Sequence, residues 1–286
     1  MAQKTWLITG VSTGFGRIMT ELLLKAGDRV AGTLRDLSAL QALQAEYGEN
    51  LWLAELDLSE TGAIRDVVDR VWNALGRIDV LVSNAGYGLM GAAEELTDAQ
   101  IRHQIDTNLL GSIQLIRAAL PHLRTQGGGR ILQLSSMGGQ VAFPGGSLYH
   151  ATKWGIEGFV DSLAEEVAVF GIGCTIVEPG GACTDFRHRS AQLGPVLDAY
   201  DASPSRMINR VIADATRVSP GDPVKMVELM IASTEQEPAP RRLALGSDAY
   251  QVMHAQISAR LQALEAQREL AVSTDFPDKT ESWFNR

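Results

Sequence analysis

The chain has 286 residues, enough for one large α/β domain or two smaller ones that bury their apolar surface without disulfides. Its 25 Lys and Arg against 34 Asp and Glu give a formal charge of −9, which disfavours general binding to nucleic acid or to an anionic membrane. The two cysteines, Cys174 and Cys183, fit neither a secreted disulfide framework nor a zinc-ligand spacing. Because we see neither a signal-peptide pattern nor a membrane-spanning apolar run, we expect a cytoplasmic protein.

Short β-branched or apolar runs alternate with longer amphipathic runs, which is typical of parallel strands joined by crossover helices. We therefore expect an α/β fold with a single Rossmann-like doubly wound parallel sheet of about seven strands and helices on both faces. Ligands of such sheets bind beyond the C-terminal ends of the strands. The expected strands are Thr5–Thr9, Arg29–Leu34, Leu51–Glu55, Val80–Ser83, Arg130–Ser135, Cys174–Glu178 and Arg241–Leu245.

Helical periodicity is clearest in Thr61–Leu75, whose apolar side chains recur at spacings of three and four and form one stripe. The stripe consists of Ile64, Val67, Val68, Val71 and Leu75. The first crossover helix is expected over Arg17–Lys25, and two late ones over Val224–Ser233 and Tyr250–Leu270.

The regular alternation weakens after Gly181, where four prolines interrupt short apolar stretches. We expect residues 184–223 to be a substrate loop that orders over the bound ligands. Residues 248–286 are expected to form a C-terminal helix and a loose tail. The predicted organisation is thus a single dinucleotide-binding and catalytic domain over residues 1–286.

A glycine-rich turn, GxxxGxG, follows the first strand and opens a helix. Glycines of this kind let the backbone approach a pyrophosphate at a helix N-terminus. The residues predicted to contact the cofactor here are Gly10, Ser12, Gly14, Phe15 and Gly16. Gly10 to Gly14 also satisfies the GxSxG pattern of a hydrolase nucleophile elbow, but only eleven residues precede Ser12, too few for the strands of that fold.

The end of the second strand indicates the cofactor type. NAD-binding proteins usually place an acid there, for the adenosine ribose hydroxyls. This chain instead has Leu34 followed by Arg35, whose guanidinium can bind a 2′-phosphate, so NADP(H) is favoured over NAD(H). The alternative is that Arg35 is a solvated charge and Asp36 is the ribose acid.

Tyr149 and Lys153 have the i, i+4 spacing that places two side chains on one face of a helix. The Lys153 cation is expected to lower the pKa of Tyr149, so that its phenol can exchange protons near neutrality. Ser136, just after a strand, can reach the same crevice and bind a substrate oxygen. Ser135 is the alternative, since a shift of one residue exchanges the faces of a strand.

With these motifs in this order, the chain resembles the short-chain dehydrogenase/reductase family, in its single-domain form, from about Thr5 to Thr184. The matching residues, in chain order, are Thr9, Gly10, Gly14 and Gly16 of the cofactor turn, the adenine-contacting pair Asp57-Leu58, the element Asn84-Ala85-Gly86, the tetrad Asn108, Ser136, Tyr149 and Lys153, and the nicotinamide segment Pro179-Gly180 with Thr184.

The resemblance implies roles for the tetrad. Tyr149 would exchange a proton with the substrate oxygen, which Ser136 would orient. Lys153 would bind the nicotinamide ribose and lower the pKa of Tyr149, and Asn108 would hold a water in the proton relay, although it could also simply pack in its helix. The resemblance also implies a homo-oligomer, in which the helix beginning near Tyr149 commonly joins a neighbouring subunit.

The leading hypothesis is an NADP(H)-dependent oxidoreductase that interconverts a secondary alcohol and a ketone by hydride transfer. The alternatives are a sugar-nucleotide epimerase or dehydratase, or a noncatalytic NADP(H)-sensing protein. The expected partner is a small apolar or aromatic carbonyl compound or its alcohol, with no nucleic acid, membrane or metal. Its pocket is expected to be lined by Leu89, Met90, Met137, Val141, Phe143 and Pro144.

Overall fold

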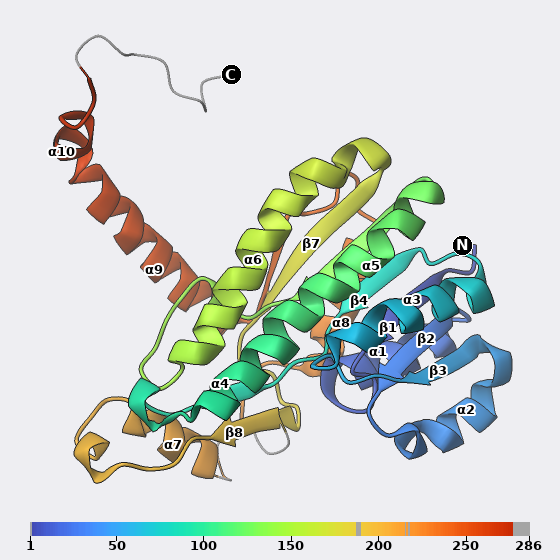
Figure 1. Cartoon of the computed structure of the whole chain (residues 1–286), viewed down its shortest axis with the longest axis horizontal. Helices are drawn as coiled ribbons and strands as arrows, with labels where there is room; N and C mark the ends of the chain where they lie inside the picture. Colours follow the sequence, from blue (N-terminus) through green and yellow to red (C-terminus); the bar gives the residue numbers. More distant parts are fainter. Residues whose placement is uncertain (1, 187–189, 215, 217, 277–286) are drawn as a thin grey trace.

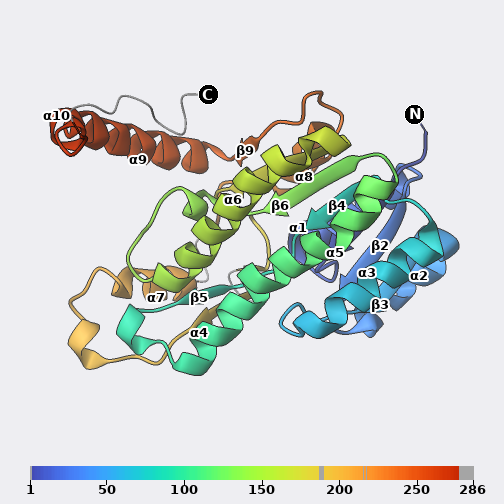
Figure 2. The same cartoon turned by 45° about the horizontal axis from the view of Figure 1, so that its top comes forward.

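The computed structural model describes residues 2–186, 190–214, 216 and 218–276. Its centre is a seven-stranded parallel sheet in the order β3-β2-β1-β4-β6-β7-β9, covered by helices (Figures 1 and 2). This confirms the expected doubly wound α/β sheet. The strands are β1 Thr5–Thr9, β2 Arg29–Leu34, β3 Leu51–Glu55, β4 Val80–Ser83, β6 Gly129–Leu134, β7 Ile172–Pro179 and β9 Arg242–Leu245.

All seven expected strands form, and the first four have the expected bounds. β7 begins at Ile172, two residues earlier than expected, because Gly171 ends the preceding turn in the left-handed region. β7 also ends one residue later than expected, β6 is shifted one residue earlier at both ends, and β9 begins one residue later. Strand identity therefore follows from the apolar pattern, whereas strand ends depend on the adjoining turns.

Two apolar layers hold the helices to the sheet. One face is covered by α1 Gly14–Lys25, α2 Gln41–Tyr47 and α8 Pro223–Ser233. The opposite face is covered by α3 Thr61–Leu75, α5 Gly111–Thr125 and α6 Ser147–Val167.

Helix α3 shows how the sequence produces this packing. Ile64, Val67, Val68 and Val71 are buried against the sheet and Leu75 is partly buried, which confirms the predicted stripe. Each fully buried side chain of this size contributes roughly 1.5–3 kcal/mol of transfer free energy. The helix ends where Gly76 adopts a positive φ.

The segment after β7 is more structured than the loop expected over residues 184–223. β8 Ala191–Leu193 pairs in parallel with β5 Gly88–Met90, and α7 Arg206–Ala213 follows. Neither short strand was predicted, because three residues carry too little periodicity to be recognised. The part of the expected loop at residues 187–189, 215 and 217 lies outside the described residues.

The C-terminal region forms two helices where one was expected over Tyr250–Leu270. α9 Ser247–Glu265 and α10 Arg268–Val272 project from the body of the molecule (Figures 1 and 2). Near the start of α9, Met253 packs against Val141. The expected tail at residues 277–286 lies outside the described residues.

The other elements are short. Helix α4 Asp98–Ile105 continues through the π-helical turn η4 Asp106–Leu110 into α5.

No helix within the described ranges is both long and apolar enough to span a membrane. Both thiols are free, with Cys174 buried and Cys183 exposed. The remaining turns are η1 Leu37–Leu40, η2 Gly48–Asn50, η3 Ala93–Glu95, η5 Met137–Gly139, η6 Ala168–Phe170 and η8 Asp198–Tyr200.

Candidate active site

The glycine-rich turn connects β1 to the N-terminus of α1. Gly10 and Gly14 have φ values of 72° and 57°, which disfavour other residues. At Gly16, a Cβ atom would collide with the carbonyl oxygen of Gly10. The turn therefore brings bare backbone close to the first N–H groups of α1, an arrangement suited to binding an anion.

The Asn84-Ala85-Gly86 element is hydrogen-bonded to this turn. The Thr9 hydroxyl oxygen accepts hydrogen bonds from the backbone N–H groups of Asn84 and Ala85, at 3.0 and 3.1 Å. The Asn84 side-chain amide donates to the Thr9 carbonyl oxygen at 2.8 Å. Since β1 and β4 are adjacent at the reversal of strand order, these bonds fix both sides of the switch point.

A cavity of about 440 Å³ begins at this turn. Most of the predicted site residues line it, whereas Gly16 and Asn108 do not. The lining includes Gly10, Ser12, Gly14, Phe15, Arg35, Asp57, Leu58, Asn84, Ala85, Gly86, Ser136, Tyr149, Lys153, Pro179, Gly180 and Thr184.

At one end of the cavity, the chain leaves β2 through Leu34 and Arg35. Leu34 is buried and Arg35 is exposed. Asp36 does not line the cavity; its carboxylate accepts a hydrogen bond from the Ser38 backbone N–H at 2.9 Å and caps a helical turn. Of the two alternatives for this position, the geometry brings Arg35 to the cavity.

Asp57 lies within electrostatic range of Arg35. Burial raises the pKa of Asp57, but hydrogen bonds from the backbone and hydroxyl of Ser59 and the nearby charges of Arg35 and His103 together hold it below its usual range. The carboxylate is consequently ionised and oriented in this part of the cavity.

Ser136, Tyr149 and Lys153 meet at the other end of the cavity. Tyr149 and Lys153 are buried one turn apart on α6, and the Tyr149 hydroxyl shares a hydrogen bond with Ser136. The Lys153 ammonium donates to the Leu134 carbonyl oxygen at 2.9 Å and lies 5.8 Å from the centre of the Tyr149 ring.

Burial dominates the pKa values of this pair. It raises the pKa of Tyr149, which the hydrogen bond from Ser136 opposes only in part. It also lowers the pKa of Lys153 to about 8, against the opposing charge of Glu157. The expectation that Lys153 leaves Tyr149 with a lowered pKa is therefore wrong, because desolvation of the phenolate outweighs the other effects.

The register at the end of β6 distinguishes Ser135 from Ser136. Both serines line the cavity, but the Ser135 hydroxyl donates a hydrogen bond to Glu157 at 2.5 Å. Ser136 is bonded to Tyr149, and its hydroxyl oxygen accepts from the Gly138 backbone N–H at 3.0 Å. Ser136 is thus the serine beside the tyrosine.

Asn108 lies in η4, below the cavity wall. Its side-chain amide donates to the Tyr87 carbonyl oxygen at 2.7 Å, and its side-chain oxygen accepts from the Tyr87 N–H at 3.0 Å. The side chain therefore fixes the segment after β4. π-Helical turns of this kind are frequent at functional sites.

Two buried side chains near the site escaped the sequence analysis. His150 lies between Gly138 and Phe143, with Nδ1 2.8 Å from the Gly138 carbonyl oxygen and Nε2 accepting from the Phe143 N–H at 3.2 Å. Burial lowers the pKa of His150, consistent with a neutral imidazole. The second residue is Glu157, whose only signal was its place one helical turn after Lys153.

The expected apolar pocket forms with a different set of residues. Met90, Met137 and Phe143 line the cavity as expected. Three expected residues do not line the cavity: Leu89, Val141 and Pro144. Leu89 points to the opposite side of β5 from Met90, and Val141 packs against α9. Residues from the segment after β7 complete the apolar wall of the cavity: Phe186, Ile208, Val211 and Ile212.

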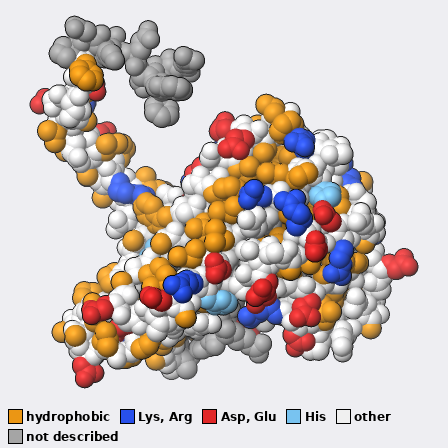
Figure 3. Space-filling model, in the orientation of Figure 1, with side chains coloured by type: hydrophobic (Ala, Val, Ile, Leu, Met, Phe, Trp, Pro, Cys, Tyr) orange, Lys and Arg blue, Asp and Glu red, His pale blue; other side chains and the backbone are white. Residues whose placement is uncertain are grey.

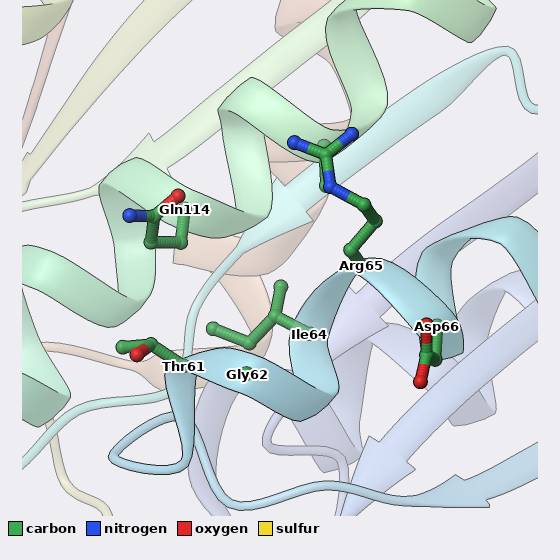
Figure 4. Close-up of a pocket in the computed structure, with 7 residues that line it drawn as sticks. Thr61, Gly62, Ile64, Arg65, Asp66 and Gln114 are labelled. Carbon is green, nitrogen blue, oxygen red and sulfur yellow. The ribbon is translucent and has the colours of Figure 1, made fainter.

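A second, smaller cavity of about 260 Å³ lies between α3 and α5. Figure 4 shows Gln114 of α5 across from Ile64 and Arg65 of α3. It contains none of the predicted site residues. Among the described residues, no group of three or more His, Cys, Asp or Glu side chains is arranged to hold a metal ion.

The sequence profile of the family described as short chain dehydrogenase matches residues 4–193, so the chain belongs to the short-chain dehydrogenase family. One relative, "Oxidoreductase BOA17" of Botryotinia fuckeliana, is 34% identical and is matched over 95% of this chain and 99% of its own. A "3-ketodihydrosphingosine reductase" of Bacteroides thetaiotaomicron is 36% identical, matched over 65% of this chain and 66% of its own.

Solved structures agree with this assignment. A short-chain dehydrogenase from Streptomyces avermitilis has 37% identity and a TM-score of 0.89, covering 96% of this chain and all of its own. The closed form of a serine dehydrogenase complexed with NADP⁺ has 27% identity and a TM-score of 0.70, covering 84% of this chain and 94% of its own. This chain is thus an oxidoreductase of the family.

Proposed function

We propose that the protein is an NADP(H)-dependent oxidoreductase that interconverts a secondary alcohol and a ketone. The observation that carries this proposal is the convergence of Ser136, Tyr149 and Lys153 at one end of a cavity whose other end contains the glycine turn and Arg35. When bound, the nicotinamide cofactor would supply or accept the hydride.

The residues present fit such a cofactor. A Cβ at Gly16 would collide with the Gly10 carbonyl oxygen and the Asn84 side-chain amide, so the close turn that would hold the pyrophosphate requires glycine there. Lys153 would hold the nicotinamide ribose, and Asp57 and Leu58 the adenine. The remaining proposed cofactor contacts are Ser12, Gly14, Phe15, Asn84, Ala85, Gly86, Tyr149, Pro179, Gly180 and Thr184.

Arg35 and Leu34 support a preference for NADP(H) over NAD(H). The guanidinium can form charge-assisted hydrogen bonds with a 2′-phosphate, and Leu34 offers the ribose no carboxylate. NADP⁺ in the structurally similar serine dehydrogenase agrees with this preference.

In the reaction, Tyr149 would transfer its phenol proton to the substrate oxygen in reduction and remove it in oxidation. Ser136, already bonded to that phenol, would hold the same oxygen. Lys153 would stabilise the phenolate left behind. Asn108 would hold the relay water through its main chain, because both ends of its side-chain amide are bound to Tyr87.

The substrate we propose is apolar or aromatic. Apolar, uncharged side chains form the walls at the substrate end of the cavity. They belong to Met90, Met137, Phe143, Phe186 and Ile208. The name of the similar 3-ketodihydrosphingosine reductase also denotes a reductase of a lipid ketone.

We further propose that the protein acts in the cytoplasm as a homo-oligomer. Apolar side chains gather on the outer face of α5 and α6 (Figure 3), and Trp154 of α6 is 42% exposed. Light scattering across a range of protein concentrations measures the assembly, and a monomer at every concentration would contradict it.

The test of the reaction is a panel of ketones and secondary alcohols, with oxidation of NADPH or reduction of NADP⁺ followed by absorbance. Turnover is expected for apolar or aromatic ketones, and Tyr149→Phe should remove it. Tight NADPH binding without turnover of any carbonyl compound would instead indicate the noncatalytic cofactor-sensing alternative.

A further inference from the structure

A buried carboxylate lies beneath the active site. Glu157, on α6 one helical turn beyond Lys153, is only 2% exposed and does not line the cavity. Its two oxygens have different partners in the Ser136 segment: Oε1 accepts from the Ser135 hydroxyl at 2.5 Å, and Oε2 from the Gln140 side-chain amide.

These two contacts span the turn that carries Ser136. Ser135 immediately precedes Ser136, and Gln140 directly follows η5. A Cβ atom at Gly139 would overlap the Glu157 carboxylate, so the turn passes close over it. One side chain therefore joins both ends of the Ser136 turn to the helix that carries Tyr149 and Lys153.

Glu157 is in turn anchored by the last strand of the sheet. Arg242 of β9 donates to Glu157 Oε2 at 2.6 Å and to Glu178 Oε1 at 2.5 Å, and it pairs with Asp161 at the solvent side. Burial and the neighbouring Glu157 raise the pKa of Glu178 to about 7. Arg242 thus lies between two buried acidic side chains, Glu157 and Glu178, and provides the positive charge that they share.

We propose that Glu157 is a positioning residue that fixes the Ser136 turn against the Tyr149 and Lys153 side chains of α6, an inference that rests on the function proposed above. Glu157 does not line the cavity, so beyond the effect of its charge on the pKa of Lys153 it acts on the reaction through Ser135 and Gln140. Small displacements of aligned groups cost large factors in rate, and a charge held by three donors resists displacement well.

The test compares Glu157→Gln with Asp161→Asn. The amide of Glu157→Gln keeps the shape, but its nitrogen cannot accept from Gln140 or Arg242. Asp161→Asn removes a carboxylate from the same helix and the same arginine without reaching the Ser136 turn. Gln140→Met, which cuts the contact to the turn and leaves the pair of Glu157 and Arg242 intact, is a second variant in case Glu157→Gln does not fold.

The first readout is amide hydrogen exchange of Gly138, Gly139 and Gln140, whose N–H groups bond within the turn. Exchange should rise at least about tenfold in Glu157→Gln and in Gln140→Met, and stay unchanged in Asp161→Asn. The second readout is kinetic: kcat should fall roughly ten- to a hundredfold in Glu157→Gln while KM for NADPH stays within about twofold.

The two readouts separate this inference from the proposed function. Unchanged exchange in folded Glu157→Gln, or in Gln140→Met if the former does not fold, would overturn the positioning role, as would an equal rise in Asp161→Asn. A wild-type protein that reduces no carbonyl compound would refute the proposed function, while exchange would still decide whether Glu157 holds the turn.

Discussion

Tyr149 and Lys153 show how burial sets the chemistry of single residues. Burial raises the pKa of the phenol and lowers the pKa of the ammonium, because each charged form loses water. In the proposed reaction the neutral phenol is therefore the proton donor for reduction. The hydrogen bond with Ser136 lowers the pKa of Tyr149 and so opposes part of the effect of burial.

Tyr149→Phe should keep the fold and the binding of NADPH, because only one hydroxyl is lost. Without the phenol proton, kcat should fall roughly a hundredfold or more. Steady-state turnover together with NADPH fluorescence titration measures both quantities. Full activity in the variant would exclude Tyr149 as the general acid.

Arg35→Ala should weaken NADPH binding and leave NADH binding nearly unchanged. A charge-assisted contact to the 2′-phosphate is worth roughly 1.5–3 kcal/mol, about ten- to a hundredfold in affinity. Added salt should reduce the wild-type preference in the same direction. Equal wild-type affinities for the two cofactors, or a preference that survives the substitution, would show that Arg35 is only a solvated charge.

Single residues differ in how far sequence reveals them. Ser136, Tyr149 and Lys153 were predictable because their spacing and order are distinctive together. Glu157 and His150 were not, since one acid or one histidine on a helix has no pattern of its own. Their partners come from separate segments that only the fold brings together.

Among the elements, the segment after β7 is attached to the body at two places. β8 pairs with β5, and further along Arg206 of α7 forms a buried ion pair with Glu95 at 2.8 Å. Glu95 also accepts from the Leu197 backbone N–H at 2.9 Å. Short strands and a buried ion pair leave no periodic signal, so the sequence showed this segment only as a loop.

Glu95→Gln should loosen α7 over the cavity. Burial raises the pKa of Glu95, but hydrogen bonds from Leu197, Ala92 and Arg206 outweigh it, and breaking one partner of a buried pair costs roughly 3 kcal/mol. Hydrogen exchange of residues 206–213 should therefore accelerate by about tenfold or more.

The matched control for Glu95→Gln is Glu94→Gln. The carboxylate of Glu94, the residue before Glu95, makes an exposed contact with Tyr200. Exchange in α7 should not change in this control. Equal exchange in wild type and Glu95→Gln would mean that the ion pair does not hold α7 in place.

For the whole molecule, Glu178 links stability to pH. Its pKa rises from 4.5 to about 7 on folding, so between these values the folded chain retains a proton that the unfolded chain has lost. The contribution of Glu178 to the free energy of unfolding is fully present below about pH 4.5 and is lost as the pH rises through 7.

Glu178→Gln should remove this dependence. The Tm of the variant relative to wild type should be higher at pH 8 than at pH 5 by several degrees, since 1 kcal/mol shifts the Tm of a domain of this size by roughly 2 °C. Thermal unfolding by circular dichroism measures the difference. Glu165→Gln, which alters an exposed pair with Arg241, should show none; parallel Tm curves for wild type and Glu178→Gln would contradict the prediction.

The attachment of Glu157 and Glu178 to β9 also has a consequence for biosynthesis. Arg242 follows Glu178 by 64 residues, which at roughly 5–20 residues per second takes about 3 to 13 s to synthesise. During that interval β7 is an open sheet edge, and neither Glu178 of β7 nor Glu157 of α6 has its arginine partner. A nascent chain arrested before Arg242 contains Asn108, Ser136, Tyr149 and Lys153, yet the Glu157 that supports the Ser136 turn still lacks its arginine.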